Sequence, residues 1–260
     1  MYTSPEEQNK PMPPVDWLWP DWVPYGQLTV LVGGGGVGKT TVAQDFIHRC
    51  VTEKPAPNGA PFFRRTNKSL FVGPYTEMQI VFRRFKQWNT DITHVSSFTS
   101  DPDPDSYIDL TRSLYRERLQ ELISEVKPDM VVLDDFFAFL PPPDTIGRYH
   151  EKLRKLQGLF SELKPDINEF PALFPPRNLD KEARHDVSRY LATLAELNQC
   201  AVLLIDPCST HESMQDVKYL PSVTFARQVI GVQRDRSSRT AHLRVLKTFS
   251  LFPKPTTVEV

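Results

Sequence analysis

The chain is poor in glycine and cysteine, and it has no long hydrophobic run. Its 260 residues include 11 glycines and 3 cysteines, which excludes collagen-like and disulfide-rich proteins. No stretch of about 18 apolar residues is present, so we expect no membrane span. Residues 1–14 are polar and lack the apolar core of a signal peptide. We therefore expect a flexible N-terminal tail on a cytoplasmic protein, with the main domain over 15–260.

The cysteines show no metal-binding spacing. Cys50, Cys200 and Cys208 are scattered without a CxxC pair, which favours free thiols in a reducing compartment. Cys50 ends a predicted helix and Cys200 opens an apolar stretch, so both are expected to pack in the core. The net charge of −1 excludes nucleic-acid binding through overall charge and leaves a local basic patch open.

Proline is abundant where glycine is scarce. The chain contains 24 prolines, about twice the average share, and seven of them fall within residues 141–178. We interpret 141–178 as an insertion on a common core, with one short helix over 147–163.

Short apolar runs alternate with amphipathic stretches along the rest of the chain. The runs predict strands, and apolar residues at three- and four-residue spacing predict helices. This alternation predicts an α/β fold: a mostly parallel sheet, helices on both faces and an antiparallel C-terminal extension. The predicted strands are 27–33, 69–73, 95–100, 130–135, 201–206, 226–233, 241–249 and 256–260. The predicted helices are 39–52, 76–88, 111–126 and 179–198, the last with an apolar face of Val187, Tyr190, Leu191, Leu194 and Leu197.

Five of the 11 glycines are concentrated within the segment GGGGVGKT, residues 33–40. The segment satisfies the pattern G-x-x-x-x-G-K-[ST] between a predicted strand and a predicted helix, the context of a phosphate-binding loop. Glycines let backbone N–H groups converge on a phosphate, and the helix N-terminus adds free donors and a positive dipole end. Lys39 is expected to reach the β- and γ-phosphates, and Thr40 to bind Mg²⁺. The predicted nucleotide-binding residues are Gly33, Gly34, Gly35, Gly36, Val37, Gly38, Lys39, Thr40 and Thr41.

Carboxylates follow two other predicted strands. Asp134 comes after MVVL and is predicted to hold Mg²⁺, mainly through a bound water. Asp135 is either an orienting group for the hydrolytic water or a cap for the chain that follows. Glu77 comes after LFVG and is the candidate for positioning the attacking water, with a solvated glutamate near a helix start as the alternative.

These motifs, in this order, resemble the RecA/DnaB-like P-loop ATPases. The resemblance runs from WLWPDWVPYGQLTVLVGGGGVGKTTVA through LFVGPYTEMQIVFRRF and KPDMVVLDDF to LNQCAVLLID, SVTFARQVIGVQ and LRVLKTF. It is closer to the hexameric plasmid replicative helicase RepA and to related AAA-labelled bacterial ATPases. It covers about residues 15–250 without 141–178, and it implies a RecA-like core that hydrolyses ATP with Mg²⁺.

The resemblance also implies roles for individual residues. Lys39, Glu77 and Asp134 would be catalytic in the subunit that binds ATP. Arg227 would be an arginine finger that reaches the γ-phosphate of a neighbouring subunit, and Lys247 a second such cation. Fingers of this kind imply a homo-oligomer, either a ring or a filament. The ordinary alternatives are that Arg227 caps a strand and that Lys247 is simply exposed.

One position departs from the family. The strand AVLLI is followed by Asp206, where helicase relatives usually carry a histidine that senses the γ-phosphate, and the nearest histidine is His211. An acidic group near phosphates is repulsive unless it contacts a metal ion or a lysine. Altered coupling between hydrolysis and DNA is therefore expected.

Two features bear on nucleic-acid binding. Residues 227–247 contain six basic residues and one acidic residue, so they form either a hairpin that grips a phosphate backbone or an ordinary solvated hairpin. Trp17, Trp19 and Trp22 either stack on bases, fold over the core or lie in a subunit contact.

The sequence thus predicts an oligomeric, Mg²⁺-dependent ATPase that acts on or with nucleic acid, helicase-like or as an accessory in replication or recombination. The first alternative is an ATP-dependent switch or assembly module, with a protein partner at 141–178. The second is a small kinase, which is disfavoured because no acceptor-binding lid is evident between the motifs.

Overall fold

The computed structural model describes residues 14–100, 107–140, 179–207, 217, 220–234, 240–248 and 257–260. Several expected features lie outside these residues. They are the tail up to residue 13, most of the loops 101–107 and 207–220, the insertion 141–178 with its helix 147–163, Cys208 and His211.

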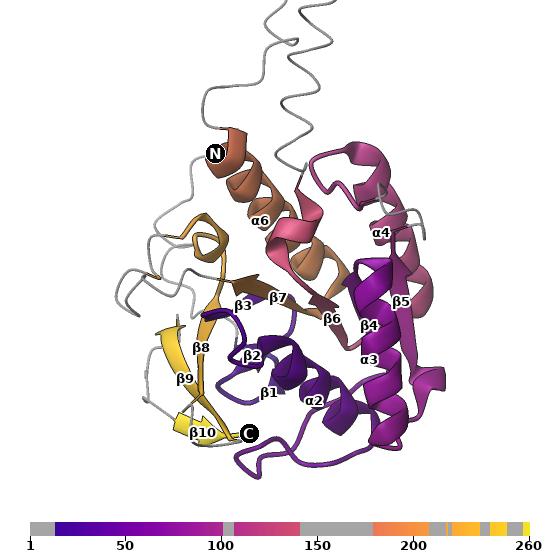
Figure 1. The fold of residues 1–260 in the computed structure, drawn as a ribbon, viewed down its shortest axis with the longest axis vertical. Helices are drawn as coiled ribbons and strands as arrows, with labels where there is room; N and C mark the ends of the chain where they lie inside the picture. The colour runs from indigo at the N-terminus through magenta and orange to yellow at the C-terminus, as the bar shows by residue number, and fades with distance from the viewer. Residues whose placement is uncertain are drawn as a thin grey trace, which may run out of the picture.

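Strands and helices alternate along the described chain (Figure 1). Every helix and strand predicted within the described residues is present, with ends that agree to within two residues. The strands are β1 (Trp17–Trp19), β2 (Val23–Pro24), β3 (Leu28–Gly33), β4 (Ser69–Gly73), β5 (Val95–Thr99), β6 (Met130–Leu133), β7 (Ala201–Pro207), β8 (Gln228–Arg234), β9 (Ala241–Thr248) and β10 (Thr257–Glu259). The helices are α2 (Lys39–Val51), α3 (Tyr75–Gln87), α4 (Ser113–Val126) and α6 (Leu179–Asn198), and the 3₁₀ turns are η1 (Ile92–His94), η2 (Phe136–Phe139) and η6 (Pro221–Val223).

Within the described residues, eight strands form one sheet in the order β10-β9-β8-β3-β7-β6-β4-β5. The strands from β8 to β5 run parallel, and β9 and β10 continue the sheet antiparallel. The predicted α/β class with an antiparallel C-terminal extension is therefore confirmed. Because β7 lies between β3 and β6, the phosphate-loop strand and the strand before Asp134 are not neighbours.

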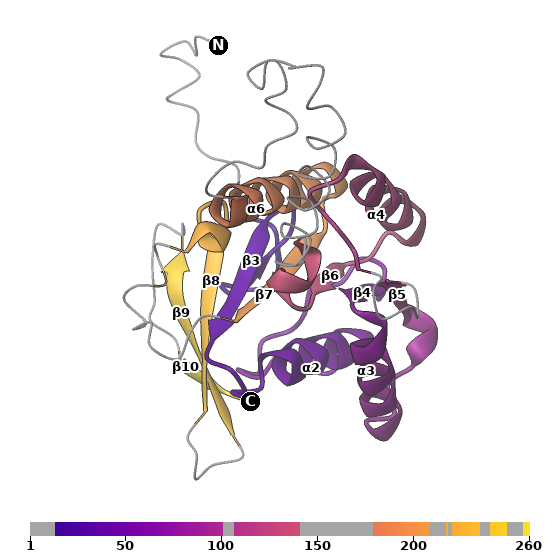
Figure 2. The same cartoon turned by 45° about the horizontal axis from the view of Figure 1, so that its top comes forward.

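Helices cover both faces of the sheet. Figure 2 shows α2 and α3 on one side and α4 and α6 on the other. Side chains alternate along each strand, so β3 sends Leu31 into the core under α2 and Val30 and Val32 into the core under α6. The predicted apolar face of α2 is fully buried, from Val42 to Cys50.

One residue of the predicted apolar face of α6 is placed differently. Val187, Leu191 and Leu194 are buried, but Leu197 is 70% exposed. At 3.6 residues per turn, Leu197 lies at the edge of the stripe that Val187 and Leu191 define. The expectation that Leu197 packs in the core is therefore wrong.

The N-terminal tryptophans belong mainly to the core. Trp19 and Trp22 are 0% and 1% exposed, and their rings stack with centroids 4.7 Å apart. The Trp19 Nε1 donates to Asn58 Oδ1 at 3.0 Å, so its polar atom is satisfied. Trp19 and Trp22 are therefore not available to stack on nucleic-acid bases.

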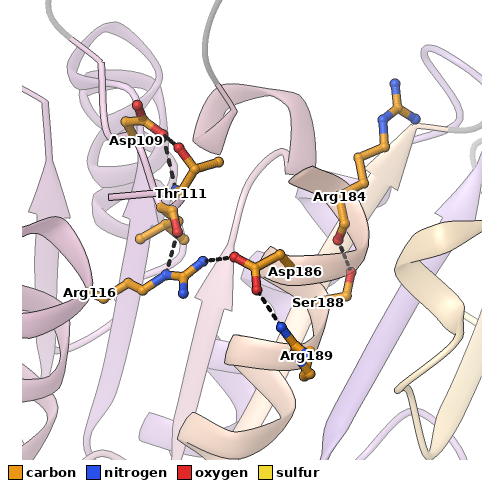
Figure 3. Close-up of polar contacts among 8 residues, drawn as sticks. Asp109, Thr111, Arg116, Arg184, Asp186, Ser188 and Arg189 are labelled. Carbon is orange, nitrogen blue, oxygen red and sulfur yellow. Dashed lines mark hydrogen bonds and ion pairs between the residues drawn. The ribbon is translucent and has the colours of Figure 1, made fainter. Parts of the chain in front are cut away.

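Polar contacts join α4 to α6 (Figure 3). Arg116 Nη2 lies 2.5 Å from Asp186 Oδ2, and Arg189 binds the other oxygen of Asp186 at 2.8 Å. Tyr190 donates its hydroxyl to the carbonyl of Arg116, whose guanidinium lies 4.7 Å from the Tyr190 ring centre. Because α6 directly follows residues 141–178 in sequence, these contacts fix the point where that segment rejoins the core.

The cysteines that the structure describes are packing residues. Cys50 and Cys200 are free and buried, and burial raises the pKa of each thiol to about 12. The expectation that they pack in the core is confirmed. The helices of the described chain include none with the length and apolar character that a bilayer span requires.

Candidate nucleotide-binding site

The predicted phosphate loop joins β3 to α2 and depends on glycine at both ends. A Cβ added to Gly33 would lie 2.6 Å from the carbonyl oxygen of Val232, so only glycine fits beside β8. Gly38 is the N-cap of α2 with a φ of 95°, in the left-handed region that disfavours other residues. The loop therefore brings the N-terminus of α2 to the carboxyl end of the parallel strands, where anions bind in this class of sheet.

Lys39 is held over this loop. Its side chain is buried, at 7% exposure, and Nζ lies 2.8 Å from the carbonyl oxygens of both Gly33 and Gly34. Two acceptors fix the ammonium group above the backbone that would cradle a phosphate. This geometry suits the predicted contact of Lys39 with the β- and γ-phosphates.

Thr40 and Asp134 lie close together. The Thr40 hydroxyl is near enough to the Asp134 carboxyl to lower its pKa, and Asp134 is buried, at 8% exposure. The pKa of Asp134 is raised to about 6, mainly by burial and also by the nearby Asp135 and Glu77 carboxylates, while Thr40 and Lys39 oppose the shift. The structure thus brings together Lys39, Thr40, Glu77 and Asp134, which lie in three separate segments of the sequence.

These groups fit a magnesium ion. A buried carboxylate next to a hydroxyl and to two further carboxylates gains from a divalent cation that relieves the repulsion. The residues that the structure describes include no cluster of three histidines, cysteines or carboxylates able to enclose a metal by themselves. Mg²⁺ takes most of its ligands from phosphates and water in sites of this kind, so Thr40 and Asp134 suffice as the protein's contribution.

The other two carboxylates have different surroundings. Asp135 is the N-cap of η2, and its Oδ1 accepts from the backbone N–H of Phe137 at 2.9 Å and of Ala138 at 3.2 Å. Two roles were predicted for Asp135, orienting the hydrolytic water or capping the chain that follows, and the structure shows the cap. Glu77 is exposed in the first turn of α3, free to meet a water at the edge of the site.

Asp206 lies on β7 and does not face the phosphate loop. It pairs with Val32, whose side chain packs on the α6 face of the sheet, and paired residues of parallel strands point to the same face. Its carboxylate is buried, and the Ser222 hydroxyl on η6 donates a hydrogen bond to it. Direct repulsion of a phosphate by Asp206 is disfavoured by this placement.

Arg227 and Lys247 are not part of this site in their own chain. The backbone N–H of Arg227 donates to the Leu28 carbonyl at 2.8 Å, at the start of β3, whereas the phosphate loop follows the end of that strand. Lys247 pairs with Val229, and its Nζ donates to the carbonyl of Val223 at 2.8 Å. Burial lowers the pKa of Lys247. Both residues lie at the far end of the sheet, so a role for them at a γ-phosphate would require a second subunit.

One residue beside the loop was not predicted as a site residue. Arg84 on α3 lies with Nη1 3.1 Å from Thr41 Oγ1, and Thr41 is the last of the predicted nucleotide-binding residues. In the sequence it is the second member of an Arg-Arg pair. Nothing in the spacing shows which member of the pair faces α2.

The fold and the site define a RecA-like P-loop NTPase. Residues 2–145, more than half of the chain, match a family model that is described as an AAA domain, AAA_25. The chain belongs to this family of P-loop NTPases, which bind and hydrolyse nucleoside triphosphates. A search of curated proteins finds no match to the chain.

Proposed function

We propose that the protein is an Mg²⁺-dependent ATPase that works as a homo-oligomer and acts on or with nucleic acid. The observation that carries the ATPase proposal is the contact between Thr40 at the phosphate loop and the buried Asp134 carboxyl. It joins the two halves of a magnesium–phosphate site, as triphosphate hydrolysis in P-loop enzymes requires.

Each residue of the site has a task in this reaction. Lys39 and the loop N–H groups bind the phosphates and neutralise charge that builds up in the transition state. Thr40 and Asp134 hold the ion, which draws electron density from the phosphoryl oxygens when it is bound. Glu77, exposed at the edge of the site, accepts a hydrogen bond from the attacking water and orients it toward the γ-phosphorus.

The positions of Arg227 and Lys247 support the proposal of an oligomer. A subunit that stacks the far end of its sheet on the phosphate-loop end of its neighbour would bring these cations to the neighbour's γ-phosphate. Charge neutralisation of this kind accelerates phosphoryl transfer strongly, which gives the assembly a catalytic purpose. A helicase of the RepA type is one form that such an assembly takes.

The nucleic-acid part rests on the charge of residues 227–247. Arg234 and Arg244 are exposed on β8 and β9, whereas Arg227 and Lys247 are half-buried. Arg236 and Arg239 lie outside the described residues. Exposed arginines on one hairpin are the pattern expected of a backbone-binding element.

A switch or assembly module is the second candidate. Leu140, the last described residue before 141–178, comes five residues after Asp135, and η2 packs between them against β7. A nucleotide-dependent shift of Asp134 therefore has a short route to that segment and to any protein partner that binds it.

Turnover of ATP with and without single-stranded DNA separates the two candidates. The nucleic-acid proposal expects DNA to stimulate turnover, and expects the double variant Arg234→Ala/Arg244→Ala to lose the stimulation while the basal rate stays. The matched control is Arg118→Ala, which removes an exposed arginine from α4, away from the hairpin. Wild-type ATP turnover that is unaffected by DNA would favour the switch or assembly module over the nucleic-acid proposal.

A further inference from the structure

Arg84 is bound to neutral groups only. This half-buried residue on α3 reaches across to α2, where its Nη1 lies 2.5 Å from Gln44 Oε1 and 3.1 Å from Thr41 Oγ1. Its guanidinium carbon lies 6.0 Å from the centre of the Trp88 ring. Two uncharged oxygens and an aromatic ring orient the group without neutralising it.

Three other half-buried arginines of the described chain each lie near a carboxylate. Arg49 lies 2.6 Å from Asp45, and Arg64 lies 3.5 Å from Glu53. Arg116 is held by Asp186 as described above. Among the described residues, no carboxylate lies within ion-pair distance of Arg84. A partly desolvated cation without a counter-ion is costly, and an anion from outside the chain would remove that cost.

The contacts leave one edge of the guanidinium available. Nη1 makes both hydrogen bonds, and within the described part of the chain Nε and Nη2 have no hydrogen-bond partner. These two N–H groups form the planar fork that binds two phosphate oxygens at once. Gln44 is fully buried with its Nε2 unpartnered, which is what results when the amide turns its oxygen toward Arg84.

The position along α3 indicates which phosphate is in reach. Arg84 comes seven residues after Glu77, so the two lie on the same face of α3, two turns or about 10 Å apart. In the proposed function, Glu77 lies at the γ-phosphate end of the site. Thr41 lies one residue beyond the Mg²⁺-binding Thr40, on the side where the loop N–H groups hold the α- and β-phosphates.

We infer that Arg84 binds the α-phosphate of the nucleotide held by its own subunit, with Thr41 and Gln44 as the groups that aim it. The inference rests on the proposed nucleotide binding and adds a residue to it. Arg84 therefore contacts ADP and ATP alike. This separates its role from that of Arg227 and Lys247, which are proposed to act across a subunit boundary and on the γ-phosphate.

Titration calorimetry with Mg²⁺–ADP and with a nonhydrolysable ATP analogue tests this role. A hydrogen-bonded charge at a phosphate is worth about 1.5–3 kcal/mol, so Arg84→Ala is expected to weaken both nucleotides by about tenfold or more. The two losses are expected to agree within about twofold, because the lost contact is common to both ligands. Arg84→Lys keeps the charge without the fork, so it is expected to lose less. Arg83→Ala, the exposed neighbour on α3, is the control and is expected to bind as the wild type does.

The same titrations distinguish between the ways in which the inference could be wrong. Equal binding by Arg84→Ala and the wild type, with a lower thermal midpoint of the variant, would make Arg84 a helix-to-helix contact and overturn the inference. A loss confined to the ATP analogue would place Arg84 at the γ-phosphate and overturn the α-phosphate assignment. If Arg84→Ala does not fold, Arg84→Lys decides by the same two criteria. A wild type that binds neither nucleotide overturns the proposed function itself.

Discussion

The Thr40 hydroxyl lies close enough to the Asp134 carboxyl to lower its pKa, although these residues follow strands that are not neighbours in the sheet. β7 separates β3 from β6, so this interaction joins residues that follow strands on either side of β7. The first residue of α2 after Lys39 is thereby tied to the end of β6. Binding of phosphate and binding of a metal ion are consequently properties of one connected site.

Asp134→Asn is expected to stabilise the protein in metal-free buffer. The pKa of Asp134 is raised to about 6 from 3.8, so its ionised form costs stability at pH 7.5, by about 2–3 kcal/mol. Below the unfolded-state pKa the carboxyl is protonated in both states and the cost vanishes. Urea unfolding with a chelator should show the variant more stable at pH 7.5, with the two proteins converging toward pH 4.

Asp135→Ala provides the matched control for that experiment. Asp135 caps η2, so its loss is expected to lower the free energy of unfolding by about 1 kcal/mol. A destabilised Asp134→Asn variant at pH 7.5 would mean that the Asp134 carboxylate is a stabilising group and would contradict the burial argument.

His48 is expected to make stability fall in mild acid. Lys54 Nζ, which only donates, lies 3.0 Å from Nε2, so Nδ1 carries the proton and donates to Thr90 Oγ1 at 2.8 Å. Burial, with Lys54 as a further cause, lowers the pKa of His48 below its usual 6.5. The unfolded chain therefore binds the proton first, and stability present above pH 6.5 is lost as the pH falls through and below that value.

His48→Gln keeps an acceptor and a donor without titrating near neutrality. Urea unfolding from pH 7.5 to 5.0 should give a flatter stability profile for this variant than for the wild type. Parallel profiles would show that His48 titrates alike in the folded and unfolded states.

Ser222→Ala is expected to cost about 1–3 kcal/mol of stability. The variant removes a hydrogen bond to the buried Asp206 carboxylate, and the alanine side chain has no donor to replace it. Thr224→Ala, an exposed change two residues on, is the control and should lie within about 0.5 kcal/mol of the wild type. Chemical denaturation of the three proteins measures the free energy of unfolding. Equal stabilities of the two variants would mean that the Ser222 hydrogen bond to Asp206 does not stabilise the fold.

Arg227 acting across a subunit boundary is tested by mixing inactive variants. Lys39→Ala lacks the phosphate-binding lysine and Arg227→Ala lacks the proposed finger, so each alone is expected to hydrolyse little ATP. In mixed oligomers a Lys39→Ala subunit can offer Arg227 to the intact loop of its neighbour. A 1:1 mixture should therefore recover activity at about a quarter of the boundaries. No recovery, or full activity of Arg227→Ala alone, contradicts the role in trans.

Much of the fold was predictable because its signals are local. The apolar runs before Gly33, Asp134 and Asp206 are the core strands that they predict, since a doubly covered parallel sheet leaves little room for polar residues. The phosphate loop was equally evident, because Gly38 and Lys39 occur in a fixed pattern between strand and helix. Trp19 and Trp22 were ambiguous, since an aromatic residue suits a core and a binding surface equally.

The remaining features depend on contacts between distant residues. Asp129 accepts hydrogen bonds from the Tyr25 hydroxyl and from the backbone N–H of Arg65, Thr66 and Asn67, which are 62 to 104 positions away. No local pattern marks an aspartate for that role. The orientation of Arg84 toward Thr41 depends in the same way on how α3 packs against α2.

Hydrolysis of ATP measured with Mg²⁺ in the wild type, Lys39→Ala and Glu77→Gln tests the central claim most directly. We expect the wild type to turn over ATP, and Lys39→Ala to lose both nucleotide binding and turnover. Glu77→Gln is expected to bind nucleotide with wild-type affinity but to turn it over about 100-fold or more slowly. A wild type without turnover, or a Lys39→Ala variant that still hydrolyses ATP, would contradict the claim.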